Sequence, residues 1–129
     1  MLNVKRAYGH FTCILAIIAI ILPWQAQAIG GSPPDNAQLT GALPAEGTTF
    51  SSSPIVALSW TPGFDIDGDL DGYSVVVDSN ASTNPDLTVD YTSLPSYFRV
   101  FEGVDTYFHI IAVDLLGNQS TLATYGPWR

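Results

Sequence analysis

The chain has 129 residues, with 12 acidic side chains, 4 basic ones and a formal net charge of −8 at pH 7. This length fits one small domain. The acidic balance excludes the usual basis of nucleic-acid binding, because contact with phosphate backbones depends on clustered Lys and Arg side chains.

The first 28 residues have the order of regions found in a secretory signal peptide. Lys5 and Arg6 give a positive start, residues 11–22 form an unbroken apolar run, and Ala26 and Ala28 supply small residues for cleavage. An uncleaved membrane anchor is the alternative, but a spanning helix needs about 20 apolar residues. We therefore expect cleavage after Ala28, a secreted, periplasmic or cell-envelope location, and no membrane span in the mature chain.

Removal of this segment changes the chemistry of what remains. Cys13 is lost, so the mature chain has no disulfide and no thiol that could act as a nucleophile or metal ligand. Arg99 and Arg129 are the basic residues left, and the mature net charge is 2 − 12 = −10. Such a chain should avoid anionic membrane surfaces, whereas its acidity is compatible with divalent cations.

The mature chain begins with a leader and continues as short strands. Gly, Pro and polar residues dominate positions 29–36, which predicts a flexible leader. Beyond it, apolar and polar side chains alternate, as expected of strands with one buried face. The candidate strands cover residues 38–40, 56–60, 73–77, 87–89, 96–100, 106–114 and 121–125. About seven short strands separated by turn signals predict an all-β fold, an immunoglobulin-like antiparallel β-sandwich over residues 37–129.

Two stretches carry a family pattern, LSWTPGFDIDGDLDGYSVVVD (58–78) and TYFHIIAVDLLGNQS (106–120). Trp60 ends one strand, Tyr73 opens the next, and a later strand runs through Phe108 and alternating apolar residues into an Asp and a Gly-Asn turn. From Ile55 to Trp128 the chain resembles the fibronectin type III family in its bacterial secreted and surface version. The resemblance implies a sandwich with Trp60 in its core and a role in binding, adhesion or spacing.

One position departs from that family. Its members usually carry a Tyr where this chain has Thr106, and the Tyr hydroxyl bonds back to the chain at a corner. Here Tyr107 comes one place later. On a strand, a shift of one place puts the side chain on the opposite face, so the tyrosine corner is not expected in its usual form.

The stretch DIDGDLDG, from Asp65 to Gly72, has aspartates at alternate positions and ends on a glycine. From Asp67 it fits a calcium-loop template with Asp78 at the twelfth place. The flanks predict strands rather than the helices of an EF-hand, and Asp78 would lie about 20 Å from Asp71 at ~3.3 Å per residue.

Two interpretations of the aspartate stretch stay open. One is a polar turn. The other is an extracellular-type calcium site, in which a cation relieves the repulsion among carboxylates. Its ligands would be Asp65, Asp67, Asp69 and Asp71.

In the strand 106–114, alternation directs Phe108, Ile110 and Ala112 toward the core, so the side chains between and beside them should face outward. That outward row is Tyr107, His109, Ile111 and Val113, with Val76 beside it on the neighbouring strand. A contiguous exposed apolar surface often marks an interface, here for a protein or carbohydrate partner. The alternative is that the leader or a partner loop covers the row.

The sequence offers little for catalysis. His109 is the only histidine of the mature chain, and no motif pairs it with a serine. Hydrolysis by two carboxylates needs a cleft that holds both groups at a set separation, and a small sandwich with short loops offers little cleft. We predict a secreted non-enzymatic binding or structural module, with a calcium-binding module as the alternative and a small carboxylate-based hydrolase as a minor one. Calcium is the one candidate cofactor.

Overall fold

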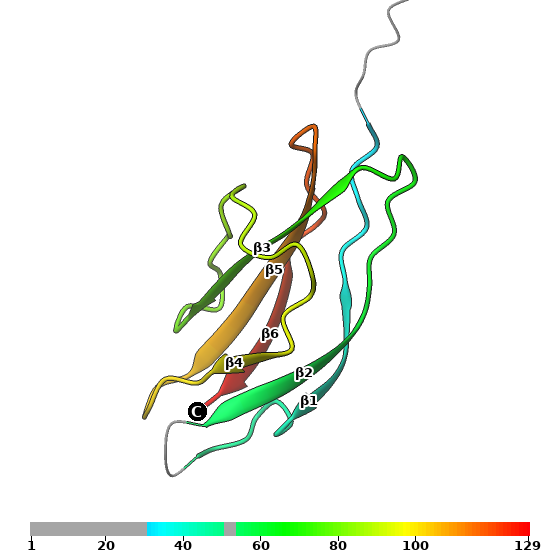
Figure 1. Cartoon of the computed structure of the whole chain (residues 1–129). Coiled ribbons are helices and arrows are strands. Elements are labelled where there is room, and N and C mark those ends of the chain that lie inside the picture. Colours follow the sequence, from blue (N-terminus) through cyan, green and yellow to red (C-terminus); the bar gives the residue numbers. More distant parts are fainter. Residues whose placement is uncertain (1–30, 51–53) are drawn as a thin grey trace, which may run out of the picture.

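The computed structural model describes residues 31–50 and 54–129 (Figure 1), so the predicted signal peptide lies outside the described residues. The described residues form six strands: β1 (Gln38–Leu43), β2 (Ile55–Thr61), β3 (Leu70–Asp78), β4 (Tyr97–Arg99), β5 (Thr106–Asp114) and β6 (Ala123–Trp128). They build two antiparallel sheets, with strand orders β1–β2–β4 and β3–β5–β6, that pack together as a β-sandwich. The predicted fold class is confirmed, with six strands rather than seven. No helix in the described part of the chain is long and apolar enough to cross a membrane.

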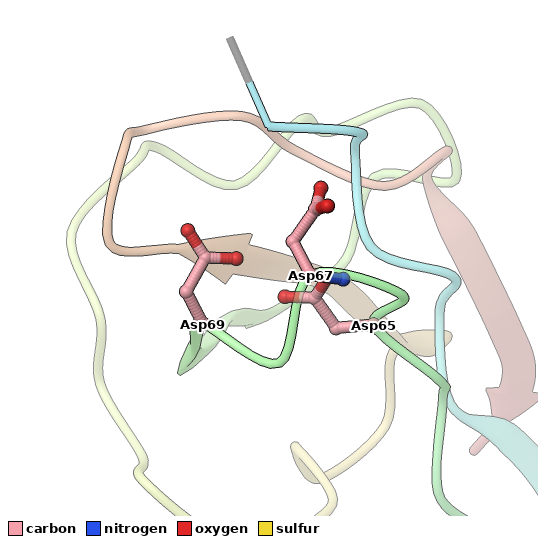
Figure 2. A group of neighbouring side chains, drawn as sticks. All are labelled: Asp65, Asp67 and Asp69. Atoms are coloured by element: carbon pink, nitrogen blue, oxygen red, sulfur yellow. The ribbon is translucent and has the colours of Figure 1, made fainter. Parts of the chain in front are cut away.

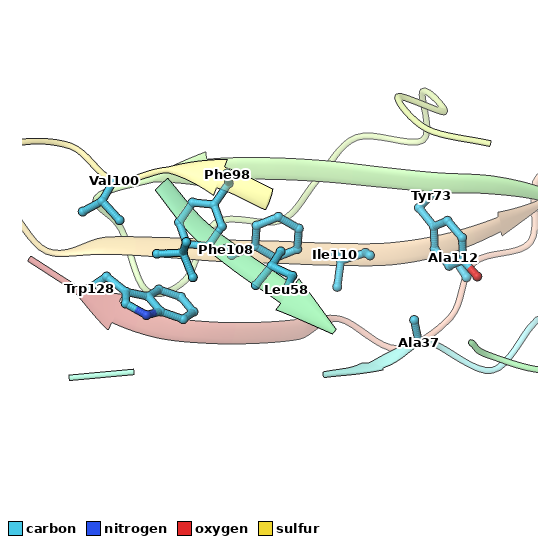
Figure 3. Close-up of a cluster of buried hydrophobic side chains, with 10 residues drawn as sticks. Ala37, Leu58, Tyr73, Phe98, Val100, Phe108, Ile110, Ala112 and Trp128 are labelled. Atoms are coloured by element: carbon cyan, nitrogen blue, oxygen red, sulfur yellow. The ribbon is translucent and has the colours of Figure 1, made fainter. Parts of the chain in front are cut away.

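The core lies between the two sheets and is densest at one end (Figure 3). Phe98 packs against Phe108 and Trp128, with ring centroids 5.3 Å and 5.0 Å apart. Phe108 and Trp128 are almost completely buried. Trp60 is only partly buried; it packs against Phe108 at 5.7 Å and donates its Nε1–H to the carbonyl of Pro95 at 2.7 Å. Trp128, which the sequence did not single out, is thus the more deeply buried tryptophan.

The corner before β5 uses a threonine. Thr106 is fully buried, and its hydroxyl oxygen accepts a hydrogen bond from the backbone N–H of Phe101 at 3.0 Å. Tyr107 lies on the other face of the strand, beside the ring of His109 at a centroid distance of 6.3 Å. The short side chain of Thr106 therefore makes a local link to the chain just upstream, and Tyr107 takes no part in it.

The predicted strand at residues 87–89 is the one that does not form. Side chains supply the bonds that a ladder would need: Asp90 accepts the N–H of Val75 at 2.7 Å, and Asp86 accepts the N–H of Thr88 at 2.8 Å. The β-bridge between Tyr73 and Tyr91 is the one backbone ladder element that this part of the described chain forms with β3. Local side-chain bonds of this kind compete with sheet formation, and they account for the lost strand.

The expected exposed row on β5 was wrong. His109, Ile111 and Val113 are buried, while Tyr107 and Val76 are half-buried. The cover is the chain's own segment between β3 and β4: Asn80 places its carbonyl 2.9 Å from His109 Nε2. Ser74, on the same face, lies 3.4 Å from carboxylate oxygens of both Asp86 and Asp90. Neither the leader nor a partner is needed to cover this face.

The leader is packed rather than flexible over the residues that the structure describes. Pro34 and Asn36 are buried. The side-chain amide of Asn36 donates to the carbonyls of Ile110 at 2.8 Å and Thr121 at 3.0 Å. These bonds hold the leader against β5 and the start of the β6 region, and they bring residues 31–35 to the loops at one end of the sandwich.

Candidate functional site

Three of the four predicted aspartates meet at one end of the sandwich (Figure 2). Asp65, Asp67 and Asp69 lie on the loop between β2 and β3, and each offers a carboxylate oxygen within 4.8 Å of the others. The loop connects the two sheets, so its position is fixed by the strand ends at Thr61 and Leu70. We refer to Asp65, Asp67 and Asp69 as the aspartate cluster.

Local bonds curl the loop so that alternate carboxylates converge. The backbone N–H of Asp67 donates to Asp65 Oδ1 at 3.0 Å, and the N–H of Gly68 donates to the Asp65 carbonyl at 3.2 Å. Gly68 has a φ of +74°, a conformation that glycine adopts without the strain a side chain would bring. The glycine inside the aspartate run therefore allows the turn that gathers the cluster.

Two other segments hold the loop in place. The N–H of Ser32 in the leader donates to Asp67 Oδ2 at 2.5 Å, and the N–H of Leu115 in the β5–β6 turn donates to the Asp69 carbonyl at 2.9 Å. The turn also holds the leader, because the Asn118 amide donates to the Gly31 carbonyl at 3.1 Å. Leader, loop and turn thus form one connected unit around the aspartate cluster.

Two carboxylate oxygens in the cluster have no hydrogen-bond partner among the described residues. They are Asp65 Oδ2 and Asp69 Oδ1, and both are shielded from solvent. A shielded carboxylate oxygen without a partner is costly. Burial raises the pKa of Asp69, and the neighbouring Asp65 and the charge of Asp114 raise it further. The arrangement favours either a proton or a cation between Asp65 and Asp69.

Asp114 adds a fixed negative charge beside the cluster. It ends β5, is buried, and accepts hydrogen bonds from the N–H groups of Leu116 at 2.9 Å and Asn118 at 2.7 Å. The Asn118 side-chain amide donates a third bond at 2.7 Å. Burial acts to raise the pKa of Asp114, but these donors outweigh it and the pKa is lowered. Sequence analysis did not assign Asp114 to the site, although its place before the Gly-Asn turn was visible.

The other acidic residues of the predicted loop template lie apart. Asp71 is exposed on β3 and does not belong to the aspartate cluster. Asp78 lies at the far end of β3, opposite Tyr107, where it accepts the Thr83 hydroxyl at 2.5 Å. That bond, first among several causes, lowers the pKa of Asp78. The expectation that Asp78 could not join the loop carboxylates is confirmed.

The donor set of the cluster consists of oxygen atoms alone. Hard cations such as Ca²⁺ and Mg²⁺ prefer oxygen ligands, whereas zinc sites usually include imidazole or thiolate. Ca²⁺ takes six to eight ligands and tolerates irregular geometry, so three aspartates would need backbone oxygens or water to complete it. The two unpartnered oxygens fit such an ion in chemistry and charge.

No protein-family model, curated protein or solved structure matches this chain. The relation to the fibronectin type III family therefore depends on residues of this chain alone, such as Trp60 and Tyr73. The antiparallel β-sandwich is shown by the structure, while the family remains a prediction.

Proposed function

We propose that the chain is an exported, non-enzymatic binding or structural module of the fibronectin type III kind. The observation that carries this proposal is the path of the described chain through the sandwich (Figure 1). The chain enters beside Asp67, through the Ser32 bond, and leaves at the opposite end, where the N–H of Arg129 donates to the Thr48 carbonyl at 3.0 Å. The loops at both ends of the sandwich lie outside the two sheets and are available for contacts, as expected of a binding or structural module.

Export is tested by mass spectrometry of the chain recovered from the host's extracytoplasmic fractions. We expect Ile29 as the first residue. A variant with Ala26→Arg and Ala28→Arg should keep the uncleaved precursor, because signal peptidase requires small residues there. Recovery of the chain with intact Met1 from the cytoplasm would contradict the proposal.

A second function, calcium binding, is favoured by the two shielded, unpartnered oxygens of Asp65 and Asp69. A divalent cation would neutralise the carboxylates and tie the loop to the leader through Asp67, which already accepts the Ser32 N–H. With three carboxylates in the cluster, we expect an affinity of the extracellular type, with Kd about 10⁻⁴–10⁻³ M.

Calorimetric titration with CaCl₂, with MgCl₂ for comparison, tests this second function. The original chain should release or absorb heat and gain thermal stability at millimolar calcium. Asp69→Asn should lose both responses, because it removes a ligand charge from the cluster. Asp71→Asn is the matched control: it removes the same charge from an exposed residue outside the cluster, and it should keep both responses. An unchanged original chain at millimolar calcium would eliminate the site.

A further inference from the structure

Four large apolar side chains project from the same end of the sandwich as the aspartate cluster. Their exposed fractions are 68% for Phe64, 71% for Ile66, 69% for Leu115 and 47% for Leu116. We refer to these four residues as the apolar rim. They belong to two connections, the β2–β3 loop and the β5–β6 turn, that are far apart in the sequence.

The rim and the aspartate cluster are adjacent. Ile66 lies between Asp65 and Asp67 in the chain, and Leu115 bonds through its N–H to the Asp69 carbonyl at 2.9 Å. Leu116 and Asp67 both approach Gly31: a Cβ on that glycine would lie 3.1 Å from Leu116 Cδ1 and 3.3 Å from Asp67 Oδ2. One surface therefore presents apolar side chains next to carboxylates.

Packing of the core does not explain the rim, because none of its four side chains belongs to the core or packs against it. Connecting loops are usually polar and carry function, and clustered exposed apolar side chains mark interaction sites more often than isolated ones do. Any of these four positions could hold a polar residue without emptying the core. What distinguishes them from other exposed apolar side chains, such as Leu43 and Tyr97, is their place beside the aspartate cluster, which makes this end a candidate contact surface.

Charge is unevenly distributed between the two ends of the sandwich. Six acidic residues lie on the leader, loop and turn at the rim or at the adjoining strand ends: Asp35, Asp65, Asp67, Asp69, Asp71 and Asp114. The described cations, Arg99 and Arg129, lie elsewhere: Arg99 pairs with Ile55 at the start of β2, and Arg129 lies 3.9 Å from Asp105. The rim therefore faces outward in a strongly negative environment.

We propose that the apolar rim and the aspartate cluster form a docking surface for a protein that presents apolar side chains flanked by Lys or Arg. Charge complementarity selects this occupant: an ammonium or guanidinium group can pair with the exposed carboxylate of Asp67, beside the charges of Asp65 and Asp69, while apolar side chains cover Ile66 and Leu115. A second copy would bring the same negative end, and an anionic lipid surface would be repelled.

This inference rests on the proposal that the chain is a binding module, and it does not require calcium. Calcium bound to the aspartate cluster would neutralise the carboxylates that attract a partner's ammonium group. Added calcium should therefore weaken docking if both proposals hold, and should leave it unchanged if only docking holds.

The test uses a synthetic peptide with a Leu-Phe pair flanked by two lysines on each side. Two matched peptides replace the lysines with glutamates, or the Leu-Phe pair with serines. Titration into the ¹⁵N-labelled chain should shift amide resonances at Ile66, Asp69 and Leu115 with the lysine peptide only, and binding should weaken as salt is added.

Variants locate the contact. The double change Ile66→Ser and Leu115→Ser should weaken binding of the lysine peptide about tenfold or more, as expected when central contacts are removed. Leu43→Ser is the matched control, because Leu43 is 75% exposed on β1 away from the rim, and binding should stay unchanged. Asp69→Asn should weaken binding and reduce its dependence on salt.

Several outcomes would overturn the inference. These are no amide shifts at millimolar peptide, equal binding of the glutamate peptide, or an equal effect of Leu43→Ser. Tighter binding to phosphatidylserine vesicles with calcium would assign the rim to a membrane, and concentration-dependent self-association lost in Ile66→Ser would assign it to a second copy. Export with Ile29 as the first residue is measured separately, so loss of docking alone leaves the exported structural module standing.

Discussion

The two ends of the sandwich differ in how their side chains and backbone groups are paired. At the end near Trp128, aromatic rings fill the space, the Trp128 Nε1–H donates to the Pro44 carbonyl at 3.0 Å, and Arg129 exchanges backbone bonds with Thr48 and Phe50. At the other end, Asp65 and Asp69 hold shielded oxygens without partners among the described residues. The contrast lies in the polar groups: one end pairs its polar groups across the chain, while the other keeps two carboxylate oxygens without partners, as functional sites often do.

The largest loss of stability should come from the aromatic end. Phe108→Ala empties the space beside Phe98 and Trp60, and we expect a cost of about 3–5 kcal/mol in the free energy of unfolding. Equilibrium urea unfolding followed by tryptophan fluorescence measures it. Phe108→Leu, which keeps more of the volume, should cost less and serves if the alanine variant does not fold.

Phe64→Ala is the control for this comparison, since it makes the same truncation on a side chain that is 68% exposed at the loop end. Its effect should stay within about 0.5 kcal/mol. Similar losses for Phe64→Ala and Phe108→Ala would mean that the two ends do not divide stability as the packing indicates.

The sequence was sufficient to predict six of the seven proposed strands and the inner face of β5, because a period of two directly records which side chains meet the opposite sheet. It was not sufficient for the outer face. His109 and Ile111 are buried by residues 79–90 of the same chain, which belong to the connection between β3 and β4. We refer to this connection as the crossover. The alternation within β5 does not predict that this polar crossover covers the apolar row. Burial that depends on distant segments is not encoded in the period of one strand.

The next largest effect should come from the crossover that covers β3. A Cβ on Gly72 would lie 2.5 Å from Val89 Cγ1 and would also overlap the Tyr91 carbonyl. Gly72→Ala should therefore cost about 1–3 kcal/mol as an overpacking change and speed hydrogen exchange at the Tyr91 N–H, which bonds to the Tyr73 carbonyl at 3.1 Å.

Gly41→Ala is the matched control for the crossover, because its added Cβ would approach only Ser59 Cβ, at an ordinary 3.8 Å. Exchange at Tyr91 should not change in this variant. Equal stability and exchange in the two alanine variants would show that the crossover does not press on β3 at Gly72.

A smaller loss is expected from the polar contacts beneath the crossover. His109→Phe keeps a ring but leaves the Asn80 carbonyl, the Thr124 hydroxyl and the Asp78 carboxylate without this partner, at 2.9 Å, 3.0 Å and 3.3 Å in the original chain. We expect a cost of about 1–2 kcal/mol, with faster proteolysis between residues 79 and 95. Thr124→Val removes one of the three contacts and should cost less. Unchanged proteolysis in His109→Phe would mean that the crossover is held elsewhere.

The candidate site was predictable in part for the same reason as the fold. Alternate aspartates in a glycine-containing loop predict convergence, and Asp65, Asp67 and Asp69 do converge. Asp71 does not, because β3 has already begun at Leu70 and a bulge follows between Leu70 and Gly72. Asp114 comes close through strand register, which pairs it with Leu70 across β3 and β5, and register is not visible in either segment alone.

The smallest effect on stability should come from Asp69→Asn in the metal-free chain. Unlike the core substitutions, this change should stabilise the fold. The pKa of Asp69 is raised above its ordinary 3.8 in the folded chain, first by burial and then by Asp65. The folded chain therefore binds the proton more tightly, and stability falls as pH rises from about 3.8 through the raised pKa. Asp69→Asn should remove this loss and leave the metal-free chain slightly more stable at pH 7, as measured by thermal unfolding in EDTA. Asp78 should show the opposite pH dependence. Its pKa is lowered from the ordinary 3.8, so its carboxylate stabilises the fold above about pH 3.8, and this stabilisation is lost as the pH falls below that value. A lower midpoint for Asp69→Asn in EDTA at pH 7 would mean that the carboxylate is already satisfied there, and the loop end would then lose its main reason to bind a cation.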